Sequence, residues 1–317
     1  MSTLITGVAG FIGSRLALKL LSQNKTVIGI DNLNSYYDVK LKKHRLNSLK
    51  KYKKFKFMKI ELSNKLLLEK KIKNEKIKTI CHLAAQAGVR YSFDNPRVYL
   101  KYNLDGFLEI LEYCRKRPYI KLVYASSSSV YGKNKKIPFS IKDNVSSPVS
   151  LYAATKMANE LMAESYKELF SLKLIGLRFF TVYGPWGRPD MAIWNFTESI
   201  LKDESIKVFG RGKVSRDFTY IDDIIKGILS AMNYKFHIGK GKHVIFNLGN
   251  NQPISVNQMI SNLEKILGKK AKKIYLPMQP GDVKKTFADI DLSRKELKYD
   301  PSTELYQGLE KFVNWFK

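Results

Sequence analysis

Three evenly spaced glycines near the amino terminus constrain the fold of this chain more than any other feature of its sequence. Gly7, Gly10 and Gly13 follow the apolar run Thr3–Thr6 and stand at the start of the amphipathic stretch Phe11–Leu21. Glycine lets the backbone turn tightly and lets an anion approach the free N–H groups of a helix N-terminus. The order therefore predicts a strand, a glycine turn and a helix, as in dinucleotide-binding units. The same glycines would also suit a plain tight turn, so the surrounding sequence has to decide.

Short apolar runs alternate with amphipathic stretches through the amino-terminal half of the chain. The expected strands are Thr3–Thr6, Thr26–Ile30, Phe55–Ile60, Thr79–Leu83, Lys121–Ala125 and Leu174–Phe179, and the expected helices include Phe11–Leu21, Tyr99–Arg115 and Tyr152–Leu169. This alternation predicts an α/β fold with a doubly wound parallel (Rossmann) sheet, whose ligand binds at the carboxyl ends of the strands.

The regular alternation stops after Gly184, where prolines begin to punctuate loops. We therefore expect a smaller C-terminal α/β substrate-binding domain. The expected division is 1–183 for the dinucleotide-binding part, with a returning segment near 214–250, and 184–317 for most of the substrate-binding part.

An acidic residue after the second expected strand indicates which dinucleotide is bound. Asp31 follows the run Ile28-Gly-Ile30 and stands 18 residues past Gly13. A carboxylate there accepts hydrogen bonds from the adenosine ribose hydroxyls and repels a 2′-phosphate. We therefore expect NAD, not NADP. The contacts expected from this first unit are Gly7, Gly10, Phe11, Ile12, Gly13, Asp31 and Asn32.

A tyrosine and a lysine four residues apart are the candidate catalytic pair. Tyr152 and Lys156 lie on one face of an expected helix. A free phenol is a poor base at neutral pH, but a nearby ammonium and a positive nicotinamide favour the phenolate and lower the pKa. A lone pair of this kind is usually a surface pair. Here the hydroxyl-rich strand end Tyr124–Gly132 precedes it, although serines there would also suit a turn.

Composition limits the other classes of function. Lysine and arginine number 56 against 28 acidic residues, which gives a formal net charge of +28. Such a charge suits nucleic acid or an anionic membrane surface, but the lysines are dispersed and the arginines lie inside motifs, so we favour a solvated basic surface. Cys81 and Cys114 form no metal-ligand spacing, no metal site is expected, and a reducing compartment is indicated. No signal peptide or membrane-spanning run is visible, so we expect a cytoplasmic protein without nucleic-acid or membrane partners.

Longer motifs give the chain a family resemblance. It resembles the extended short-chain dehydrogenase/reductases, and within them it is most similar to bacterial UDP-glucuronate 4-epimerases. The resemblance runs from Thr6 to Trp315. The motifs that carry it are His82–Ser92, Ser150–Lys156, Arg178–Ala192, Arg216–Asp223 and Met278–Asp282.

The resemblance implies a role for individual residues. Ser127 and Tyr152 match the catalytic hydroxyl and the base, and Lys156 matches the residue that binds the nicotinamide ribose and tunes Tyr152. Arg216 matches a residue that holds the UDP phosphates, and Asp282 matches the aspartate of a C-terminal substrate loop, where a structural role is equally open. Tyr152, Lys156 and the strand-end segment Leu83, Ala84 and Ala85 complete the expected NAD contacts.

The residues beside the catalytic serine favour epimerisation over elimination. Related dehydratases and decarboxylases carry acidic residues where this chain has Ser128 and Ser129, and a serine has no useful acid/base pKa. The expected reaction is 4-epimerisation of a UDP-sugar through a 4-keto intermediate, and the resemblance favours conversion of UDP-glucuronate to UDP-galacturonate. The residues expected to fix the sugar carboxylate are Ser128, Ser129, Thr181 and Arg188, with Arg188 equally suited to bonding loop carbonyls.

Several alternatives stay open at this stage. The sugar is alternatively UDP-glucose or a UDP-N-acetylhexosamine, and a non-catalytic NAD-binding regulator is the alternative from another class. Two departures from the family pattern are Glu61, where many members have Asp against adenine, and Thr181, where many have Asn. Surplus apolar positions on Tyr99–Cys114 and Leu151–Phe170 predict a homodimer, with ordinary helix-on-sheet packing as the alternative.

Overall fold

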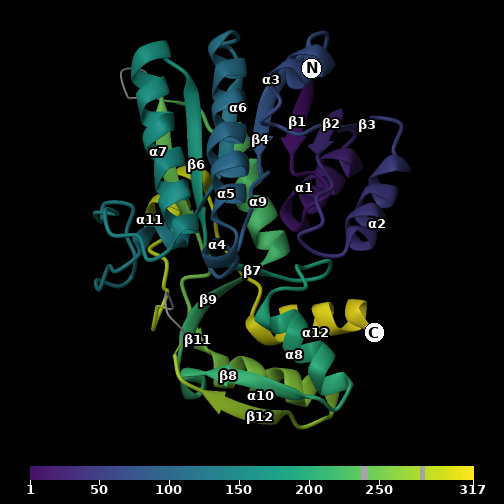
Figure 1. Cartoon of the computed structure of the whole chain (residues 1–317), viewed down its shortest axis with the longest axis vertical. Coiled ribbons are helices and arrows are strands. Elements are labelled where there is room, and N and C mark those ends of the chain that lie inside the picture. The colour runs from purple at the N-terminus through teal and green to yellow at the C-terminus, as the bar shows by residue number, and fades with distance from the viewer. Residues whose placement is uncertain (237–241, 279–282) are drawn as a thin grey trace.

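A seven-stranded parallel sheet forms the centre of the molecule. The structure is a computed structural model that describes residues 1–236, 242–278 and 283–317. The strands run in the order β10-β6-β5-β4-β1-β2-β3, and every neighbouring pair is parallel. Their bounds are β1 (Ser2–Thr6), β2 (Val27–Asp31), β3 (Phe55–Lys59), β4 (Ile77–His82), β5 (Lys121–Ser127), β6 (Lys173–Phe179) and β10 (His243–Leu248). The predicted doubly wound parallel sheet is confirmed (Figure 1).

Helices cover both faces of this sheet and bury two apolar cores. One core joins the sheet to α1 (Phe11–Ser22), α2 (Val39–Lys50) and α9 (Ile221–Asn233). The other joins the opposite face to α3 (Lys65–Ile72), α6 (Gly106–Arg115) and α7 (Leu151–Phe170). Residues on β2, β4 and β5 are nearly all buried, as expected for parallel strands covered on both sides.

A second, smaller group of elements lies below the carboxyl ends of the central strands (Figure 1). It holds a three-stranded sheet ordered β11-β9-β7 and a two-stranded sheet of β12 and β8. The strand bounds are β7 (Thr181–Tyr183), β8 (Ser205–Phe209), β9 (Ser215–Tyr220), β11 (Pro253–Ser255) and β12 (Lys272–Leu276). The helix bounds are α8 (Ala192–Leu201), α10 (Val256–Leu267) and α12 (Leu305–Phe316). Helix α11 (Asp291–Leu297) lies instead at the central sheet, where it packs against β10 and α9.

The chain returns to the central sheet after it has built part of this lower group. Strand β10 pairs in parallel with β6, from His243 against Leu174 to Leu248 against Phe179. Helix α9 packs beside α1, where the Arg15 guanidinium donates two hydrogen bonds, of 2.7 and 3.0 Å, to the Asp222 carboxylate. The last strand of the sheet therefore comes from a late part of the chain.

One expected helix is interrupted, which corrects the prediction of a continuous helix over Tyr99–Arg115. The segment contains α5 (Pro96–Tyr99), a π-helical turn at Leu100–Asp105 and then α6. The wider turn carries Asn103, whose side chain accepts from the Gln86 N–H at 2.8 Å and donates to the Gln86 carbonyl at 3.1 Å. Single π turns of this kind frequently occur at functional sites. Here the turn fixes the loop that follows β4.

Three short elements remain, of which the first two lie at the same edge of the sheet and the third packs against β8 and β12 in the lower group. They are α4 (Tyr91–Asp94) and two 3₁₀ turns, Ser128–Tyr131 and Gly210–Gly212. Within the part of the chain that the structure describes, no helix combines the length and apolar character needed to cross a bilayer.

Candidate active site

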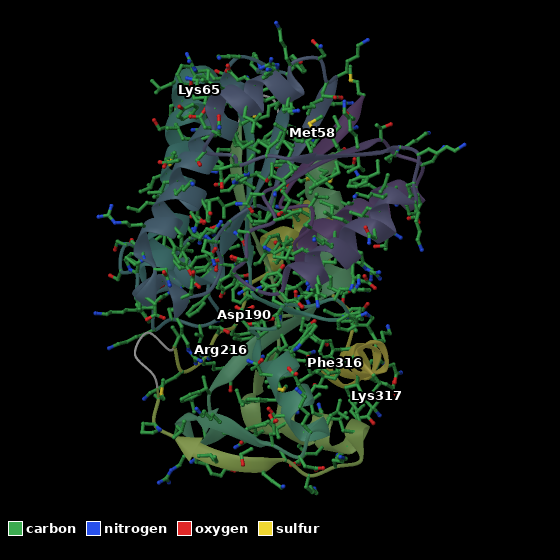
Figure 2. All side chains as sticks on the ribbon, turned by 45° about the vertical axis from the view of Figure 1, so that its right-hand side comes forward. Met58, Lys65, Asp190, Arg216, Phe316 and Lys317 are labelled. Carbon is green, nitrogen blue, oxygen red and sulfur yellow. The ribbon has the colours of Figure 1, made fainter. Side chains whose placement is uncertain are left out.

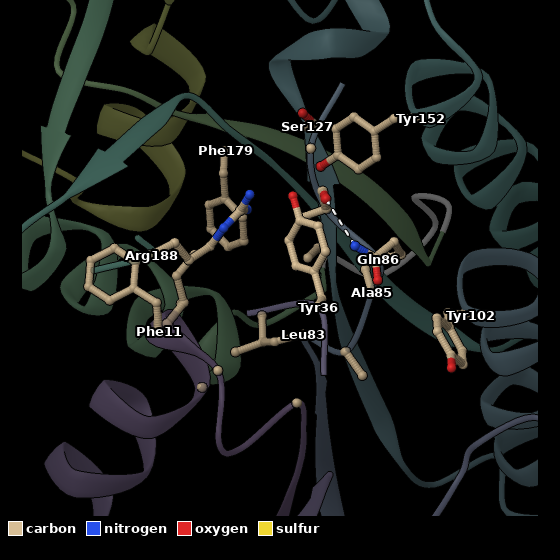
Figure 3. A pocket seen from close by; sticks show the side chains of 18 of the residues that line it. Phe11, Tyr36, Leu83, Ala85, Gln86, Tyr102, Ser127, Tyr152, Phe179 and Arg188 are labelled. Carbon is tan, nitrogen blue, oxygen red and sulfur yellow. Dashed lines mark hydrogen bonds between the residues drawn. The ribbon is translucent and has the colours of Figure 1, made fainter. Parts of the chain in front are cut away.

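A cavity of about 420 Å³ opens at the carboxyl ends of the central strands. Loops after β1, β2, β4, β5 and β6 line it, as expected for a ligand site in an open parallel sheet. Figure 3 shows Ser127 and Tyr152 side by side at one end, with Arg188, Tyr36 and Phe11 nearer the glycine loop. The sequence-derived site residues that line it are Gly7, Gly10, Phe11, Ile12, Gly13, Asp31, Asn32, Leu83, Ala84, Ala85, Ser127, Ser128, Ser129, Tyr152, Lys156, Thr181 and Arg188.

The glycine turn has no room for side chains. Gly7 has a φ of +69°, and a Cβ there would lie 2.8 Å from the Ala84 backbone. A Cβ on Gly13 would lie only 2.2 Å from the Gly7 carbonyl oxygen, so helix α1 packs directly on the turn. Gly10 caps α1 without any side-chain hydrogen bond. The first N–H groups of α1 therefore face the cavity, an arrangement that fits a pyrophosphate.

Asp31 ends β2 and is held by backbone donors. Its Oδ2 accepts from the Ala9 N–H at 3.0 Å and its Oδ1 from the Leu33 N–H at 2.8 Å. Burial raises the pKa of this carboxyl, and the two N–H groups oppose the rise. Beside it, the Asn32 amide donates to Glu61 at 3.1 Å. A carboxylate fixed at this edge fits unphosphorylated ribose hydroxyls.

The candidate catalytic groups come from β5 and α7. Ser127 is the last residue of β5, and Tyr152 lies in the first turn of α7, whose N-cap Ser150 accepts from the Ala153 N–H at 3.1 Å. Lys156 follows one turn later, 2% exposed, and its Nζ donates to the Ala125 carbonyl at 2.8 Å. Burial lowers the pKa of Lys156 to about 8.

Three influences act on the pKa of the Tyr152 phenol. Burial raises the pKa of the phenol, while a hydrogen bond with Ser127 and the positive charge of Arg188 lower it. We expected Lys156 to be the cation that favours the phenolate. Its Nζ donates to the Ala125 carbonyl on β5, and the positive charge of Arg188 also acts on the phenol, so the role of Lys156 stays a prediction.

A buried ion pair lies beneath these groups. The Arg178 Nε and Nη2 donate to the two carboxylate oxygens of Glu160 at 2.9 and 2.7 Å, and the two side chains are 3% and 7% exposed. The hydroxyl of Ser126 donates to Glu160 at 2.5 Å. Glu160 is one helical turn past Lys156, and its charge raises the pKa of that lysine against the effect of burial. The pair thus ties α7 to the ends of β5 and β6.

A second cavity, of about 260 Å³, adjoins the first and enters the lower group of elements. Thr181 and Arg188 line both cavities, so they mark the junction. Arg216 lines the second, and its Nη1 donates to the Ser215 and Val283 carbonyls at 3.0 and 2.6 Å. Figure 2 places Arg216 at the level between the central sheet and the lower group. Asp282 lies outside the described residues.

The walls of the second cavity are mainly aromatic and cationic. The Arg90 guanidinium lies 5.1 Å from the centroid of the Phe209 ring. A cation beside an aromatic ring, with Arg216 in the same lining, suits a planar base attached to phosphates. The two cavities share lining residues and form one continuous candidate site.

Comparisons with known proteins assign the family. The model of the NAD dependent epimerase/dehydratase family matches residues 3–249. The chain belongs to this family. Two relatives are the CapI protein of Staphylococcus aureus, 46% identical over all of this chain and 98% of that one, and UDP-glucuronate 4-epimerase 4 of Arabidopsis thaliana, 46% identical over all of this chain and 75% of that one.

Solved structures extend the likeness of this epimerase/dehydratase to three dimensions. The UDP-glucuronic acid 4-epimerase of Bacillus cereus, solved with UDP-glucuronic acid and NAD, is 37% identical, covers 99% and 98% of the two chains, and superposes with a TM-score of 0.91. The UDP-glucose 4-epimerase of Thermotoga maritima, solved with UDP-glucose, is 31% identical over 100% and 98%, with a TM-score of 0.89.

Three polar residues that line or support the epimerase/dehydratase site were missed in the sequence, and Tyr36 is the one that lines the larger cavity. Arg45, 2% exposed on α2, donates to the carbonyls of Ala9 (3.1 Å), Trp186 (2.6 Å) and Gly187 (2.8 Å). It therefore ties the glycine turn to the loop that carries Arg188. Tyr36 and Asp190 are the other two, and they meet at Arg188. The doublet Tyr36-Tyr37 after Asp31 was the available signal for one of them.

Proposed function

We propose that the protein is an NAD-dependent 4-epimerase of UDP-glucuronate, converting it to UDP-galacturonate. The observation that carries the proposal is the junction of the two cavities, where Arg188 and Thr181 line the same cavity as the Ser127–Tyr152 pair. A guanidinium and hydroxyls at that position match a sugar carboxylate better than a hydroxymethyl group. Similarity to UDP-glucuronate 4-epimerases of Arabidopsis and Bacillus cereus supports the same substrate.

NAD fits the larger cavity. The glycine turn would hold the pyrophosphate, Asp31 and Asn32 the adenosine ribose, and Lys156 the nicotinamide ribose. When bound there, NAD supplies a hydride acceptor that can later return the hydride to the same sugar carbon. Tyr36 and the Leu83–Ala85 segment would close the remaining walls.

The chain's own residues then perform the proton transfer. Tyr152 accepts the proton of the sugar 4-hydroxyl and later returns it, with Ser127 hydrogen-bonded beside it. Arg188 favours the phenolate, because its positive charge opposes the effect of burial. Arg216 would hold the UDP phosphates while the 4-keto sugar turns about its pyrophosphate link, so that hydride returns to the opposite face.

The site must also prevent loss of carbon dioxide. Oxidation at C4 makes a β-keto acid, which decarboxylates when the carboxylate bond stands out of the carbonyl plane. Ser128, Ser129, Thr181 and Arg188 would hold the carboxylate near that plane. Ser128 and Ser129 also leave this position without an acid/base group that would promote elimination.

We also propose the remaining features of the working enzyme. A homodimer would form through α6 and α7, which expose Leu108 (37%) and Leu161 (71%), next to Leu100 (46%). The two buried free thiols support a cytoplasmic location. Residues 1–183 with 214–250 would bind NAD, and most of 184–317 would bind the nucleotide sugar.

One incubation tests the proposed function. Purified protein is mixed with UDP-glucuronate without added NAD, and the products are separated by chromatography. We expect UDP-galacturonate to accumulate to an equilibrium mixture. Turnover of UDP-glucose or UDP-N-acetylglucosamine with UDP-glucuronate untouched would refute the carboxylate assignment.

A matched pair of variants tests the role of the phenol. Tyr152→Phe should lose at least about 10³-fold in kcat, because general acid–base catalysis is removed. Tyr306→Phe makes the same chemical change at a side chain that is 42% exposed on α12 and should keep the rate. Equal rates in the two variants would remove Tyr152 from the mechanism.

A further inference from the structure

Arg188 is already bound by a carboxylate of the protein itself. Its Nε donates to Oδ1 of Asp190 at 2.9 Å, and its Nη2 donates to Oδ2. The same Oδ2 accepts a hydrogen bond of 3.0 Å from the Tyr36 hydroxyl. The side chains of Arg188 and Asp190 are only 22% and 30% exposed. The edge of the Arg188 guanidinium that would suit a sugar carboxylate is therefore already bound by the Asp190 carboxylate.

This cluster joins three loops at the point where the sugar would lie. A Cβ placed on Gly88 would be 2.8 Å from the Tyr36 hydroxyl and 3.8 Å from the Arg188 Nη2, so the loop after β4 closes against both. Figure 3 shows the Tyr36 ring between Arg188 and Tyr152. Arg188 lines both cavities and Tyr36 lines the larger, so both partners of the Asp190 carboxylate border the proposed substrate position.

The proposed reaction creates a difficulty at this guanidinium. The carboxylate must be fixed when C4 is oxidised, yet the same sugar must leave that position to present its other face. Releasing a carboxylate from a half-buried guanidinium leaves an uncompensated charge, which is strongly unfavourable in a poorly solvated site. An internal anion within reach removes that penalty.

We propose that Asp190 is a positioning residue that exchanges with the sugar carboxylate on Arg188. The Asp190 carboxylate releases the Arg188 guanidinium when the uronate binds. It forms its hydrogen bonds with Arg188 again while the 4-keto sugar turns. Asp190 and Arg188 are two residues apart in one loop, and the Tyr36 hydroxyl keeps the released carboxylate nearby. The inference rests on the proposed function and assigns Asp190 the control of how firmly a uronate is held.

The exchange predicts opposite effects on binding and on turnover. In Asp190→Asn the guanidinium has no resident anion to displace, so the Kd of UDP-glucuronate should fall by about tenfold, equivalent to about 1.4 kcal/mol. The kcat should also fall by about tenfold, because no carboxylate at position 190 can pair with Arg188 when the sugar turns. The Kd of UDP-glucose, which carries no carboxylate, should stay within about twofold. A loop weakened by the substitution would instead bind both sugars less well.

The binding measurement uses holoenzyme supplied with NAD and carrying Tyr152→Phe, so that no turnover disturbs the titration. Isothermal calorimetry gives the Kd of UDP-glucuronate and UDP-glucose with and without Asp190→Asn, and chromatographic assays give kcat in the enzymes that keep Tyr152. Asp291→Asn is the matched control, since it removes one negative charge from an 88%-exposed side chain on α11. Asp190→Glu keeps the charge and should restore kcat to near the parent value.

Each outcome decides the proposal. Tighter uronate binding with slower turnover, absent from the Asp291 variant and reversed by Asp190→Glu, supports the exchange. Weaker or unchanged uronate binding, or tighter binding without loss of kcat, overturns it. Failure of the unmodified enzyme to epimerise UDP-glucuronate would overturn the proposed function instead, and the two calorimetric affinities would still report whether Asp190 competes with a sugar carboxylate.

Discussion

The buried Glu160–Arg178 pair gives a prediction whose size follows from its surroundings. Glu160→Gln leaves the Arg178 guanidinium without its counter-ion in a site where the partners are 3% and 7% exposed. Removing one partner of such a pair costs about 3–5 kcal/mol, because the remaining charge stays buried. Two bonds of 2.9 and 2.7 Å, and a third from Ser126, are altered at once. We therefore expect Glu160→Gln to lower the free energy of unfolding by an amount in the upper half of that range.

Urea unfolding followed by fluorescence measures the effect against a matched control. Glu198→Gln makes the same change in the Glu198–Lys202 pair, whose side chains are 41% and 56% exposed. Water and salt screen that pair, so its loss should hardly alter the free energy of unfolding. The reasoning fails if the two variants lose similar stability.

A double substitution separates the cost of the orphaned charge from the loss of attraction. Glu160→Leu combined with Arg178→Met replaces both charges with apolar side chains of similar size. It should be more stable than Glu160→Gln by at least about 1 kcal/mol, because no unpaired charge remains. A double variant less stable than the single one would show that the attraction itself dominates.

Three further outcomes are expected. Gly13→Ala should purify with little NAD, measured by chromatography of the heat-denatured protein, because a Cβ would lie 2.2 Å from the Gly7 carbonyl oxygen. Arg45→Lys should lower the free energy of unfolding, measured by urea unfolding, by about 2–3 kcal/mol, since one ammonium cannot replace a guanidinium bonded to several carbonyls. The pH–rate profile should fall above about pH 8, where Lys156 loses its proton, and Glu160→Gln should move this limb to lower pH because the Glu160 charge raises that pKa.

Much of the site was predictable because its residues follow strand ends. The glycine turn, Asp31 and Ser127 each stand where an apolar run stops, and the carboxyl ends of parallel strands meet at one edge. The Tyr152–Lys156 spacing places both groups on one face of a helix whatever the rest of the chain does. Local spacing was sufficient for these positions except Ser127, which the family resemblance selected among the serines of its strand end.

Other features depend on contacts that no local pattern reveals. In the sequence Arg45 looks like an ordinary charged position on a basic amphipathic helix. In the fold it is buried and donates hydrogen bonds to three carbonyls that are distant in the sequence. The role proposed for Asp190 depends on its hydrogen bond with Tyr36, which comes from a different loop. The π turn at Leu100–Asp105 is set by the bonds of Asn103 to Gln86, which join two segments that the sequence leaves apart.

Because β10 comes from a late part of the chain, the central sheet cannot be completed until late in synthesis on the ribosome. Until residues 243–248 emerge, β6 presents a bare edge of N–H and C=O groups, and until α9 emerges one face of the sheet lacks its cover beside α1. Exposed strand edges template association with other chains. The nascent Rossmann half therefore needs either rapid completion or protection by a chaperone, and a fragment ending at residue 183 should aggregate.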